Sequence, residues 1–561
     1  MQEMYVMNDN SNYLLTPDEY LLRWAELHPH RVYLRQIQQG EFIEWTFLDV
    51  KESALKLVSA LHSLGIKPGD RVAIMAKNCA EWFVTDLALM LGDFVSVPIF
   101  PTADQKTINQ CITHSDCRAI FVGKLDDPSA CEHVLSQHDD LVSIAFPYPT
   151  PVCHHTFTEL IQSHSETELR VEHSNHDTMS ILYTSGTSGT PKGAMISYGA
   201  FSWTVNQIVN LLSVNEEDRL FSYLPLSHIT ERVYIFGSSI TLGVNTAFPE
   251  SLDTFIDDVK LQRPTLFLSV PRLWQRFQQR ILDKLPQKKL DFLLSVPFVD
   301  SWIKNKIAKN LGLDQARILG CGSAPISPAI LQWYERIDMP IVEAWGMTES
   351  CAFGAINYPY RSDKVGTVGR EAAGTVLSND AKSGEILLRS EGLFSGYYKQ
   401  PDLSQKAFDA EGRLRTGDIG LIDDEGFLQL TGRVIDTFKT AKGKFVSPVP
   451  IEKEIEARCK CEMLCLIGLG LVGPVLLLVP YPFTKLDRHR YEKSLTKAVN
   501  SINPTLQSHE KIRGIFIVNE PWTIENGVLT PTLKIRRFEL EKRFNDLVKE
   551  WPAGKLIVWQ E

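Results

Sequence analysis

Apolar and polar residues alternate along much of this chain in the pattern of short buried strands separated by amphipathic helices. Arg71 to Met75, Phe94 to Ile99 and Ala119 to Val122 are apolar runs of strand length, and Ala80 to Leu91 has the length and composition of a helix. A strand, a helix and a second strand in this order are typical of a βαβ unit. The alternation resumes in the second half and continues to about Gly432, which predicts an α/β fold.

Two other segments of the first half have a different pattern. We expect roughly the first 60 residues to be largely helical, with Thr16 as an N-cap before Pro17 and a second helix at residues 52–64.

Residues 124–177 show little periodicity and are rich in histidine, serine and aspartate. A metal site is one interpretation of these histidines. None of them forms a helical pair within an HExxH-like frame, so we favour a solvated surface segment.

One apolar run, Leu464 to Pro480, has the composition of a membrane-spanning segment. It contains no charged residue, but it is shorter than the roughly 20 residues that a spanning helix needs. Gly468, Gly470, Gly473 and Pro474 interrupt it in the middle. Because each half has strand length and a Gly-Pro pair favours a turn, we predict two buried strands.

The pattern changes after Gly432, where the chain begins a stretch that we interpret as a separate domain. Its predicted helices lie at Ile451–Arg458, Arg488–Ile502 and Phe538–Glu550. About 130 residues is an ordinary size for a domain. We therefore expect a large N-terminal multi-subdomain α/β domain at residues 1–432 and a small mobile C-terminal α+β domain at residues 433–561.

Composition narrows the class of protein without choosing a function. The 561 residues carry 58 Lys and Arg against 68 Asp and Glu, a net charge of −10, and 44% are hydrophobic. These are ordinary globular values, and an acidic balance argues against a dedicated nucleic-acid binder. Anionic ligands must then be bound by local cations rather than by the field of the whole protein.

The cysteines and the N-terminal residues indicate the compartment. Cys459, Cys461 and Cys465 cluster, but they lack the paired C-x2-C spacing of a structural zinc site, so we expect them to pack as free thiols. The first residues do not resemble a secretory signal. We therefore expect a soluble cytoplasmic protein with at most peripheral contact with the inner face of a membrane.

The segment Ile181 to Ala194 (ILYTSGTSGTPKGA) carries the strongest chemical signal. Glycines let the backbone approach a ligand closely, hydroxyl and successive backbone N–H groups bind anions, and a lysine adds positive charge. Pro191 before the lysine and Gly193 after it exclude a Walker A loop. A flexible Ser/Gly linker is the alternative, but runs of strand length flank the segment, so we predict a polyphosphate-binding loop. Its candidate ligand-binding residues are Thr184, Ser185, Gly186, Thr187, Ser188, Gly189, Thr190 and Lys192.

This loop resembles the phosphate loop of the adenylate-forming (AMP-binding) superfamily, which comprises acyl- and aryl-CoA synthetases, luciferases and peptide-synthetase adenylation domains. Six further segments resemble motifs of that superfamily in the same order, so the resemblance covers essentially the whole chain. They are Tyr223–His228 (YLPLSH), Gly322-Ser323-Ala324-Pro325, Glu343-Ala344-Trp345-Gly346-Met347-Thr348-Glu349, Arg415–Asp418 (RTGD), Gly432–Asp436 (GRVID) and Asn526–Lys534 (NGVLTPTLK).

The resemblance implies which residues bind the nucleotide. Gly322–Pro325 and Glu343–Gly346 correspond to segments at the adenine side of the site. Asp418 corresponds to the carboxylate that binds the ribose hydroxyls, and Arg433 is placed to assist it with its fork of donors. From the residues alone, an aspartate beside a glycine is equally a turn residue.

The resemblance also implies four catalytic residues. Thr348 corresponds to the residue that contacts the α-phosphate, and Glu349 to the one that holds Mg²⁺, a cation that prefers oxygen ligands. Lys534 corresponds to a lysine that reaches the carboxylate and the α-phosphate, where a cation offsets the repulsion between two anions. His228 corresponds to a residue that lines the acyl and thioester passage. The residues alone leave alternatives open: a core histidine, an exposed glutamate and a solvent-facing lysine on an edge strand.

Several segments resemble the long-chain fatty acyl-CoA synthetases in particular, namely Leu224–Arg232 (LPLSHITER), Val270–Trp274 (VPRLW) and Phe438–Pro448 (FKTAKGKFVSP). By this resemblance Gly443 lies beside the pantetheine tunnel. Val233–Thr246 and Ala352–Ile356 offer small and apolar side chains for an acyl channel, although ordinary core packing accounts for them equally.

Two positions depart from the superfamily pattern. Tyr198 stands where a histidine often follows the phosphate loop, and Ile435 stands where the hinge usually has lysine or aspartate. A β-branched residue is stiff, so Ile435 bears on the step that needs domain rotation.

We therefore expect an ATP-dependent acid–thiol ligase that activates a medium- or long-chain fatty acid through acyl-AMP and transfers it to CoA, with Mg²⁺ as cofactor. One alternative is an acyl-AMP or acyl-carrier-protein ligase. The other is a nucleotide-binding pseudoenzyme that acts as a lipid sensor or scaffold.

Overall fold

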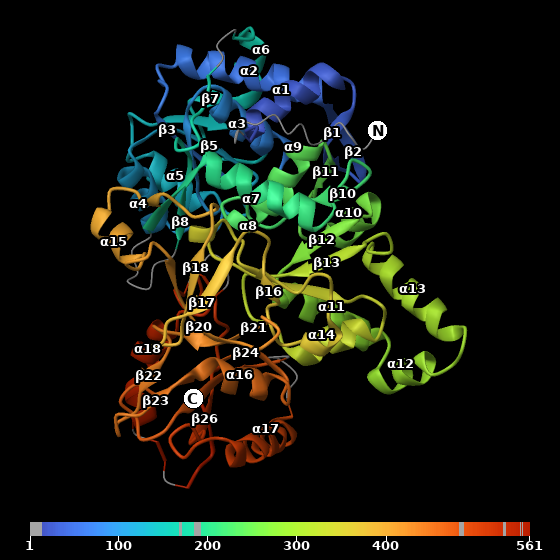
Figure 1. Cartoon of the computed structure of the whole chain (residues 1–561), viewed down its shortest axis with the longest axis vertical. Coiled ribbons are helices and arrows are strands. Elements are labelled where there is room, and N and C mark those ends of the chain that lie inside the picture. The colour runs from blue at the N-terminus through green and yellow to red at the C-terminus, as the bar shows by residue number, and fades with distance from the viewer. Residues whose placement is uncertain are drawn as a thin grey trace.

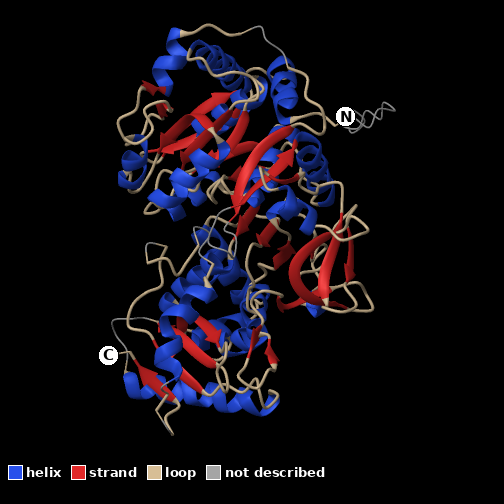
Figure 2. Cartoon of the chain, turned by 90° about the vertical axis from the view of Figure 1, so that its left-hand side faces the viewer, coloured by secondary structure: helices blue, strands red, loops and turns tan. Residues whose placement is uncertain are grey.

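The computed structural model describes residues 14–167, 171–184, 192–481, 487–524, 526–530, 534–549, 551–552 and 554–560. Figure 1 shows a large upper part, made of the N-terminal and central segments, and a smaller lower part in orange and red, made of the C-terminal segment. Strands form sheets in both parts, and helices pack on them (Figure 2). The prediction of an α/β fold with a large N-terminal and a smaller C-terminal unit is confirmed.

An eight-stranded sheet with the order β19-β9-β8-β4-β3-β5-β6-β7 organises the first half of the chain. The predicted βαβ unit is confirmed as β3 (Arg71–Ala76), α3 (Ala80–Leu91) and β4 (Val95–Pro98), and β5 (Cys117–Gly123) pairs in parallel on the other side of β3. Every residue of α3 is buried, which explains its nearly continuous apolar sequence. The predicted strands around the phosphate loop are also present, as β8 (Thr178–Thr184) and β9 (Lys192–Ser197).

The N-terminal region is only partly helical, so the prediction for it is wrong in part. α1 (Pro17–Leu27) begins after the N-cap Thr16 as predicted, and α2 (Phe47–Ser63) covers the second predicted helix except for its last residue. Between them lies an antiparallel hairpin, β1 (Val32–Gln38) and β2 (Glu41–Thr46). Gln39 and Gly40 both have positive φ, the conformation that tight hairpin turns require.

Residues 124–177 are not simply a solvated segment, and that interpretation is corrected. They form α5 (Ser129–Leu135), β6 (Val142–Ala145), β7 (His155–Thr156) and α6 (Phe157–Ser163), of which β6 and β7 extend the large sheet. His173 is 6% exposed; its Nε2 lies 2.9 Å from the Met90 carbonyl oxygen, and its ring stacks on Tyr198 with 4.0 Å between centroids. Short strands at a sheet edge give too few residues for a clear period, so the sequence pattern did not reveal them.

Two further sheets complete the upper part. One has the order β12-β13-β14-β15-β16 and the other β17-β18-β20-β21, while β10 and β11 join β1 and β2. Their strands are β10 (Arg219–Phe221), β11 (Asn245–Phe248), β12 (Leu266–Ser269), β13 (Ile318–Cys321), β14 (Ile341–Trp345), β15 (Ala355–Ile356), β16 (Arg370–Glu371), β17 (Val376–Asn379), β18 (Glu385–Arg389), β20 (Leu414–Ile422) and β21 (Leu428–Arg433), with β19 (Gly396–Tyr397) on the large sheet.

The helices of this region connect or cover those sheets. They are α4 (Gln105–Ser115), α7 (Tyr198–Leu211), α8 (Ile229–Glu231), the π-helical segment η1 (Arg232–Gly237), α9 (Ser238–Leu242), α10 (Phe255–Gln262), α11 (Pro271–Lys284), α12 (Gln287–Leu294), α13 (Val299–Leu311), α14 (Pro328–Glu335) and α15 (Pro401–Lys406).

The C-terminal part contains a mixed sheet in the order β24-β25-β26-β27. The apolar run forms β24 (Cys461–Ile467) and β25 (Val475–Pro480), paired antiparallel, so the prediction of two strands is confirmed. The other elements are β22 (Phe438–Lys439), β23 (Phe445–Val446), α16 (Pro448–Glu456), α17 (Arg488–Ile502), β26 (Gly514–Ile517), α18 (Arg537–Lys549) and β27 (Ile557–Trp559). Across the described ranges, no helix combines the length and the apolar composition that crossing a membrane requires.

The two parts are joined by polar contacts. Arg272 of α11 forms an ion pair with Glu462 of β24, with 3.0 Å between Nη2 and Oε1. Ser447, just before α16, donates a hydrogen bond to the carbonyl oxygen of Thr431 at 2.7 Å. All ten cysteines are free and none is exposed, Cys459, Cys461 and Cys465 included.

Candidate active site

The strands that flank the predicted phosphate loop bring its two ends together. Thr184 ends β8 and Lys192 begins β9, and the two residues are paired across the strands. The loop residues between them that the sequence singled out, Ser185, Gly186, Thr187, Ser188, Gly189 and Thr190, lie outside the described residues. The ammonium group of Lys192 lies over the ring of Tyr397, 5.4 Å from its centroid. The base of the loop therefore adjoins β19.

Glu349 lies in a short turn, η2 (Thr348–Ser350), that follows β14. It is only 7% exposed, so the alternative of a surface carboxylate is wrong. Its Oε1 accepts a hydrogen bond from Tyr397 Oη at 2.6 Å, and Oε2 has no hydrogen-bond partner within the described part of the chain. Gly346 permits the close backbone approach here, because a Cβ at this position would lie 2.3 Å from the carbonyl carbon of Ala352.

Asp418 lies within β20, directly opposite Arg433 of β21, and is not a turn residue. Its Oδ1 accepts a hydrogen bond from Arg433 Nε at 2.8 Å. Its Oδ2 accepts one from Trp345 Nε1, at the end of β14, at 2.7 Å. Asp418 is 6% exposed, so these donors hold a nearly buried carboxylate in a fixed orientation.

Lys534 belongs to the C-terminal part but interacts with charged residues of the N-terminal part. Burial and the neighbouring Arg433 lower its pKa to about 8, and the carboxylates of Asp418 and Glu349 partly oppose this shift. Its backbone is fixed by Thr530, whose Oγ1 accepts a hydrogen bond from Lys534 N at 3.0 Å. Lys534 is therefore part of this charged cluster and is not a solvent-facing residue of an edge strand.

His228 approaches the same cluster from the N-terminal part. Burial and the charge of Lys534 lower its pKa to about 3, so the imidazole is neutral near pH 7. Its Nδ1 accepts a hydrogen bond from Thr230 N at 3.3 Å, which places the proton of the neutral ring on Nε2. The ring can therefore donate a hydrogen bond from Nε2, for which the described residues offer no partner, unlike in a core histidine with both nitrogens satisfied.

Glu231 lies in the next turn, away from solvent. It accepts hydrogen bonds from Ser222 Oγ at 2.8 Å and Tyr223 N at 3.0 Å. Burial raises its pKa to about 8 in spite of these donors. These bonds tie α8, which follows His228, to the segment after β10.

The two segments predicted at the adenine side leave the same edge of one sheet. Gly322-Ser323-Ala324-Pro325 follows β13, and Glu343-Ala344-Trp345-Gly346 ends and follows β14, its parallel neighbour. The carboxyl edge of parallel strands is the usual place for a ligand site. Ser323 Oγ lies 3.5 Å from Thr230 Oγ1, which brings the first segment beside α8. Burial raises the pKa of Glu343 to about 7, opposed by Lys453 of α16.

Three predicted positions lie apart from this cluster. Gly443 is in an exposed turn between β22 and β23 with φ 72°, and a Cβ there would have no neighbour within 4 Å. Ile435 is 58% exposed just after β21. Tyr198 is 2% exposed and packs on His173, so the residue that replaces the usual histidine serves packing at the start of α7.

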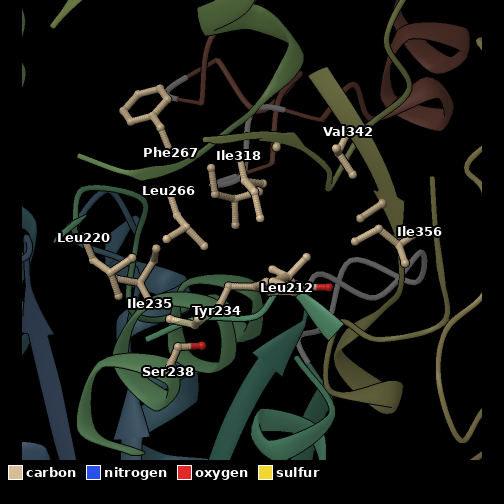
Figure 3. Close-up of a pocket in the computed structure, with 14 residues that line it drawn as sticks. Leu212, Leu220, Tyr234, Ile235, Ser238, Leu266, Phe267, Ile318, Val342 and Ile356 are labelled. Atoms are coloured by element: carbon tan, nitrogen blue, oxygen red, sulfur yellow. The ribbon is translucent and has the colours of Figure 1, made fainter. Parts of the chain in front are cut away.

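A narrow cavity opens among the strands that carry the adenine-side segments. Its volume is about 40 Å³. Ligand pockets have roughly 300–1,000 Å³, so a bound acyl chain requires the lining side chains to move apart. Figure 3 shows Leu266 and Ile318 of the sheet on one side and Tyr234 and Ile235 of η1 on the other. The lining is Leu212, Val214, Leu220, Tyr234, Ile235, Ser238, Leu266, Phe267, Leu268, Ile318, Gly320, Val342, Ala344 and Ile356. Almost every residue is apolar, and Ala344 is shared with the adenine-side segment.

The sequence identified only part of this cavity. Tyr234, Ile235, Ser238 and Ile356 come from the two stretches proposed for an acyl channel, but the remaining residues come from the segment after α7 and the strands β10 and β12–β14. Tyr397 was also missed, although it contacts both Lys192 and Glu349. A tyrosine after a glycine in a two-residue strand gives no periodic signal that points to a site.

The charged side chains of this site can hold anionic groups of ligands close to one another. Lys534, Arg433 and Lys192 supply positive charge, Asp418 and Glu349 supply carboxylate oxygens, and a neutral imidazole adds one donor. Fixed charges in a site that excludes water stabilise developing charge strongly.

Comparison with known proteins identifies the family. Residues 21–398 match the family model described as AMP-binding enzyme, and residues 436–552 match the one described as AMP-binding enzyme C-terminal domain. The chain belongs to the AMP-binding enzyme family. This AMP-binding enzyme is therefore adenylate-forming, and the resemblance on which the sequence interpretation rested is confirmed.

Relatives of this AMP-binding enzyme include long-chain acyl-CoA synthetases. It is 25% identical to the long-chain-fatty-acid–CoA ligase ACSBG2 of Gallus gallus, over 92% of this chain and 78% of the relative. It is 28% identical to the peroxisomal long chain acyl-CoA synthetase 7 of Arabidopsis thaliana, over 92% and 82%.

Solved structures of an adenylation domain and of a CoA synthetase share its fold. The adenylation domain of a carboxylate reductase from Mycobacterium chelonae superposes with a TM-score of 0.80 at 21% identity, covering 95% of this chain and 91% of that one. The o-succinylbenzoate CoA synthetase MenE from Bacillus subtilis gives 0.73 at 18%, covering 94% and 98%. At these identities the likeness shows the fold alone.

Proposed function

We propose that this enzyme activates a medium- or long-chain fatty acid with ATP and transfers it to CoA. In the first step a carboxylate oxygen bonds to the α-phosphorus of ATP, and the bond to pyrophosphate breaks. In the second step a thiolate sulfur bonds to the acyl carbonyl carbon and AMP leaves. The observation that carries the proposal is the cluster of Lys534, Asp418, Glu349 and His228 beside an apolar cavity.

Each side chain of the cluster then has a definite task. Asp418 accepts hydrogen bonds from the ribose hydroxyls, because each carboxylate oxygen keeps an acceptor site besides the one used by Trp345 or Arg433. Lys534 lies between the carboxylate and the α-phosphate, where its charge offsets their repulsion. Residues Thr184–Thr190 and Lys192 bind the phosphates, Thr348 contacts the α-phosphate, and Gly322–Pro325 adjoins the adenine.

Glu349 fits a role in holding Mg²⁺. It is a nearly buried carboxylate whose Oε1 is bound by Tyr397, which leaves Oε2 as a hard oxygen donor. Magnesium would neutralise part of the charge of the ATP phosphates there. One carboxylate with phosphate oxygens and water is a usual coordination set for this ion.

The acyl chain would occupy the apolar cavity after its lining side chains move apart. Ala344 belongs both to its lining and to the adenine-side segment, so a carboxylate near the α-phosphate has its chain beside the cavity. His228, neutral and with its proton on Nε2, can donate a hydrogen bond to the acyl carbonyl oxygen.

CoA binding and the domain division complete the proposal. We place the boundary between residues 432 and 433, with residues 433–561 as a cap that rotates between the two steps. Gly443 lies in an exposed turn of that cap, where a glycine permits close approach of the pantetheine. Ile435 is 58% exposed, so its side chain offers limited packing against a change of backbone angles at the hinge.

Fatty-acid-dependent exchange of labelled pyrophosphate into ATP tests this function. We expect exchange with acids of medium or long chain in the presence of Mg²⁺. Lys534→Ala is expected to abolish exchange while sparing thioester formation from supplied acyl-AMP. No exchange with any acid, together with tight ATP binding, would indicate a pseudoenzyme. Exchange followed by transfer to a holo carrier protein but not to CoA would indicate a carrier-protein ligase.

A further inference from the structure

The connection between β12 and β13 carries an exposed aromatic surface. It consists of α11, α12 and α13, and α12 and α13 stand at the edge of the molecule in Figure 1. Phe298, in the turn between α12 and α13, is 91% exposed, while Phe292 is 66% and Trp302 58% exposed. Isolated exposed apolar side chains are common, but a group of large aromatic rings at one tip indicates a partner.

The exposed face of α13 combines aromatic and basic residues. Phe298, Trp302, Lys306 and Lys309 follow at helical spacing, whereas the buried Ile303 and Ile307 pack on the core from the other side. The ammonium group of Lys306 lies 4.6 Å from the centre of the Trp302 ring. The aromatic ring of such a pair is apolar, and the ammonium group beside it is charged, so the pair has both an apolar and a charged end.

The charge of this region is opposite to that of the whole chain. Residues 284–309 contain six lysines and two aspartates, which gives 6 − 2 = +4, against −10 for the chain. Both aspartates already have partners: Asp291 pairs with Arg336, and Asp300 pairs with Lys304. The lysines that are exposed are Lys284, Lys288, Lys289, Lys306 and Lys309.

We propose that this tip, defined by Phe292, Phe298, Trp302 and the exposed lysines of residues 284–309, docks on an anionic lipid bilayer. Aromatic rings are favoured at the headgroup level, and lysines beside them bind anionic headgroups. The chain as a whole is acidic, so an anionic membrane repels the rest of the protein surface. The local positive charge of the tip therefore sets one orientation of the protein on the membrane.

Docking in this orientation has a consequence for the acyl cavity, and this part rests on the proposed function. β12 and β13, the strands at either end of the connection, both line the cavity. The tip therefore holds the cavity-forming sheet close to the phase in which long-chain acids concentrate.

Sedimentation with vesicles tests the docking without ATP or fatty acid. We expect the protein to bind vesicles of equal parts phosphatidylcholine and phosphatidylglycerol, to bind pure phosphatidylcholine weakly, and to dissociate as salt rises. Phe298→Ala with Trp302→Ala is expected to lower partitioning by at least about tenfold. Lys288→Gln with Lys289→Gln is expected to lower it roughly fivefold per lysine.

Matched variants separate docking from non-specific effects. Leu252→Ser removes an apolar side chain that is 75% exposed but lies between Glu250 and Asp253, and Lys493→Gln with Lys497→Gln removes two exposed lysines of α17. Both are expected to bind as the wild type does. Equal binding of all variants, or no binding to anionic vesicles, would overturn the proposal. Self-association lost in Phe298→Ala would instead make the tip an interface between copies. Pyrophosphate exchange with an acid of medium chain is measured separately, so loss of the proposed function and loss of docking are distinguishable.

Discussion

The lowered pKa of Lys534 predicts that adenylation slows at alkaline pH. The pKa of this side chain lies below its ordinary value, at about 8, so its charge is present at neutral pH and is lost as the pH rises. The protonated fraction falls from roughly 0.9 at pH 7 to roughly 0.1 at pH 9. Because only the ammonium form offsets the repulsion between carboxylate and phosphate, kcat/KM for ATP is expected to fall about tenfold over this range.

Pyrophosphate exchange measured across pH provides the assay, since kcat/KM reports the ionisation of the free enzyme. Lys534→Arg keeps its positive charge at every pH measured, so its profile is expected to lose the alkaline fall even if its highest rate is lower. Lys493→Arg, at an exposed lysine of α17, is the matched control and is expected to keep the wild-type profile. A wild-type rate that stays constant to pH 9, or the same alkaline fall in Lys534→Arg, would refute the assignment.

Three further substitutions test separate contacts. Tyr397→Phe removes the hydrogen bond to Glu349 and is expected to raise the Mg²⁺ concentration for half-maximal exchange roughly tenfold, without affecting thioester formation from acyl-AMP. Burial raises the pKa of Glu231 to about 8, so the wild type loses stability as the pH rises towards 8; Glu231→Gln is expected to remove this slope of up to about 1.4 kcal/mol per pH unit, measured by urea unfolding. Ser238→Leu fills part of the cavity and is expected to shift the ratio of exchange rates towards shorter acids roughly tenfold.

Each of these three predictions has an outcome that would contradict it. An unchanged Mg²⁺ requirement in Tyr397→Phe, checked by titration of Mn²⁺ binding in the presence of ATP, would remove the tyrosine from the positioning of Glu349. A Glu231→Gln stability curve parallel to that of the wild type would show that Glu231 is ionised in the folded state. A uniform loss of rate for all acids in Ser238→Leu would indicate general damage rather than a shortened cavity.

The parts of the fold that the sequence predicted are those with long, strongly patterned elements. α3 and α17 have the predicted bounds, and the run at residues 464–480 forms two strands, because its glycines and proline exclude a continuous helix. The β1–β2 hairpin and the short strands β6 and β7 were missed. β1 also pairs with β11, a partner distant in the chain that a local pattern does not contain. β6 and β7 have only four and two residues, too few to show a period.

The candidate site was found through motifs rather than through periodicity. The residues around Asp418, Glu349 and Lys534 come from segments far apart in the sequence, and the family resemblance is what grouped them. What the motifs could not give is how these groups are held. The bond from Trp345 to Asp418 and the contacts of Tyr397 depend on side-chain positions that only the folded chain defines.

One contact between the two parts of the molecule is sensitive to ionic strength. Arg272 and Glu462 form their ion pair with both side chains still about 30% exposed. A pair in such a setting contributes at most about 1 kcal/mol and weakens as salt screens it. A free-energy difference of about 1.4 kcal/mol changes a two-state population tenfold, so loss of this pair alone would change the population of any alternative orientation of the C-terminal part by less than tenfold. Salt can therefore remove the Arg272–Glu462 contact between the two parts, whereas the hydrogen bond from Ser447 to Thr431 and the charge interactions of Lys534 remain.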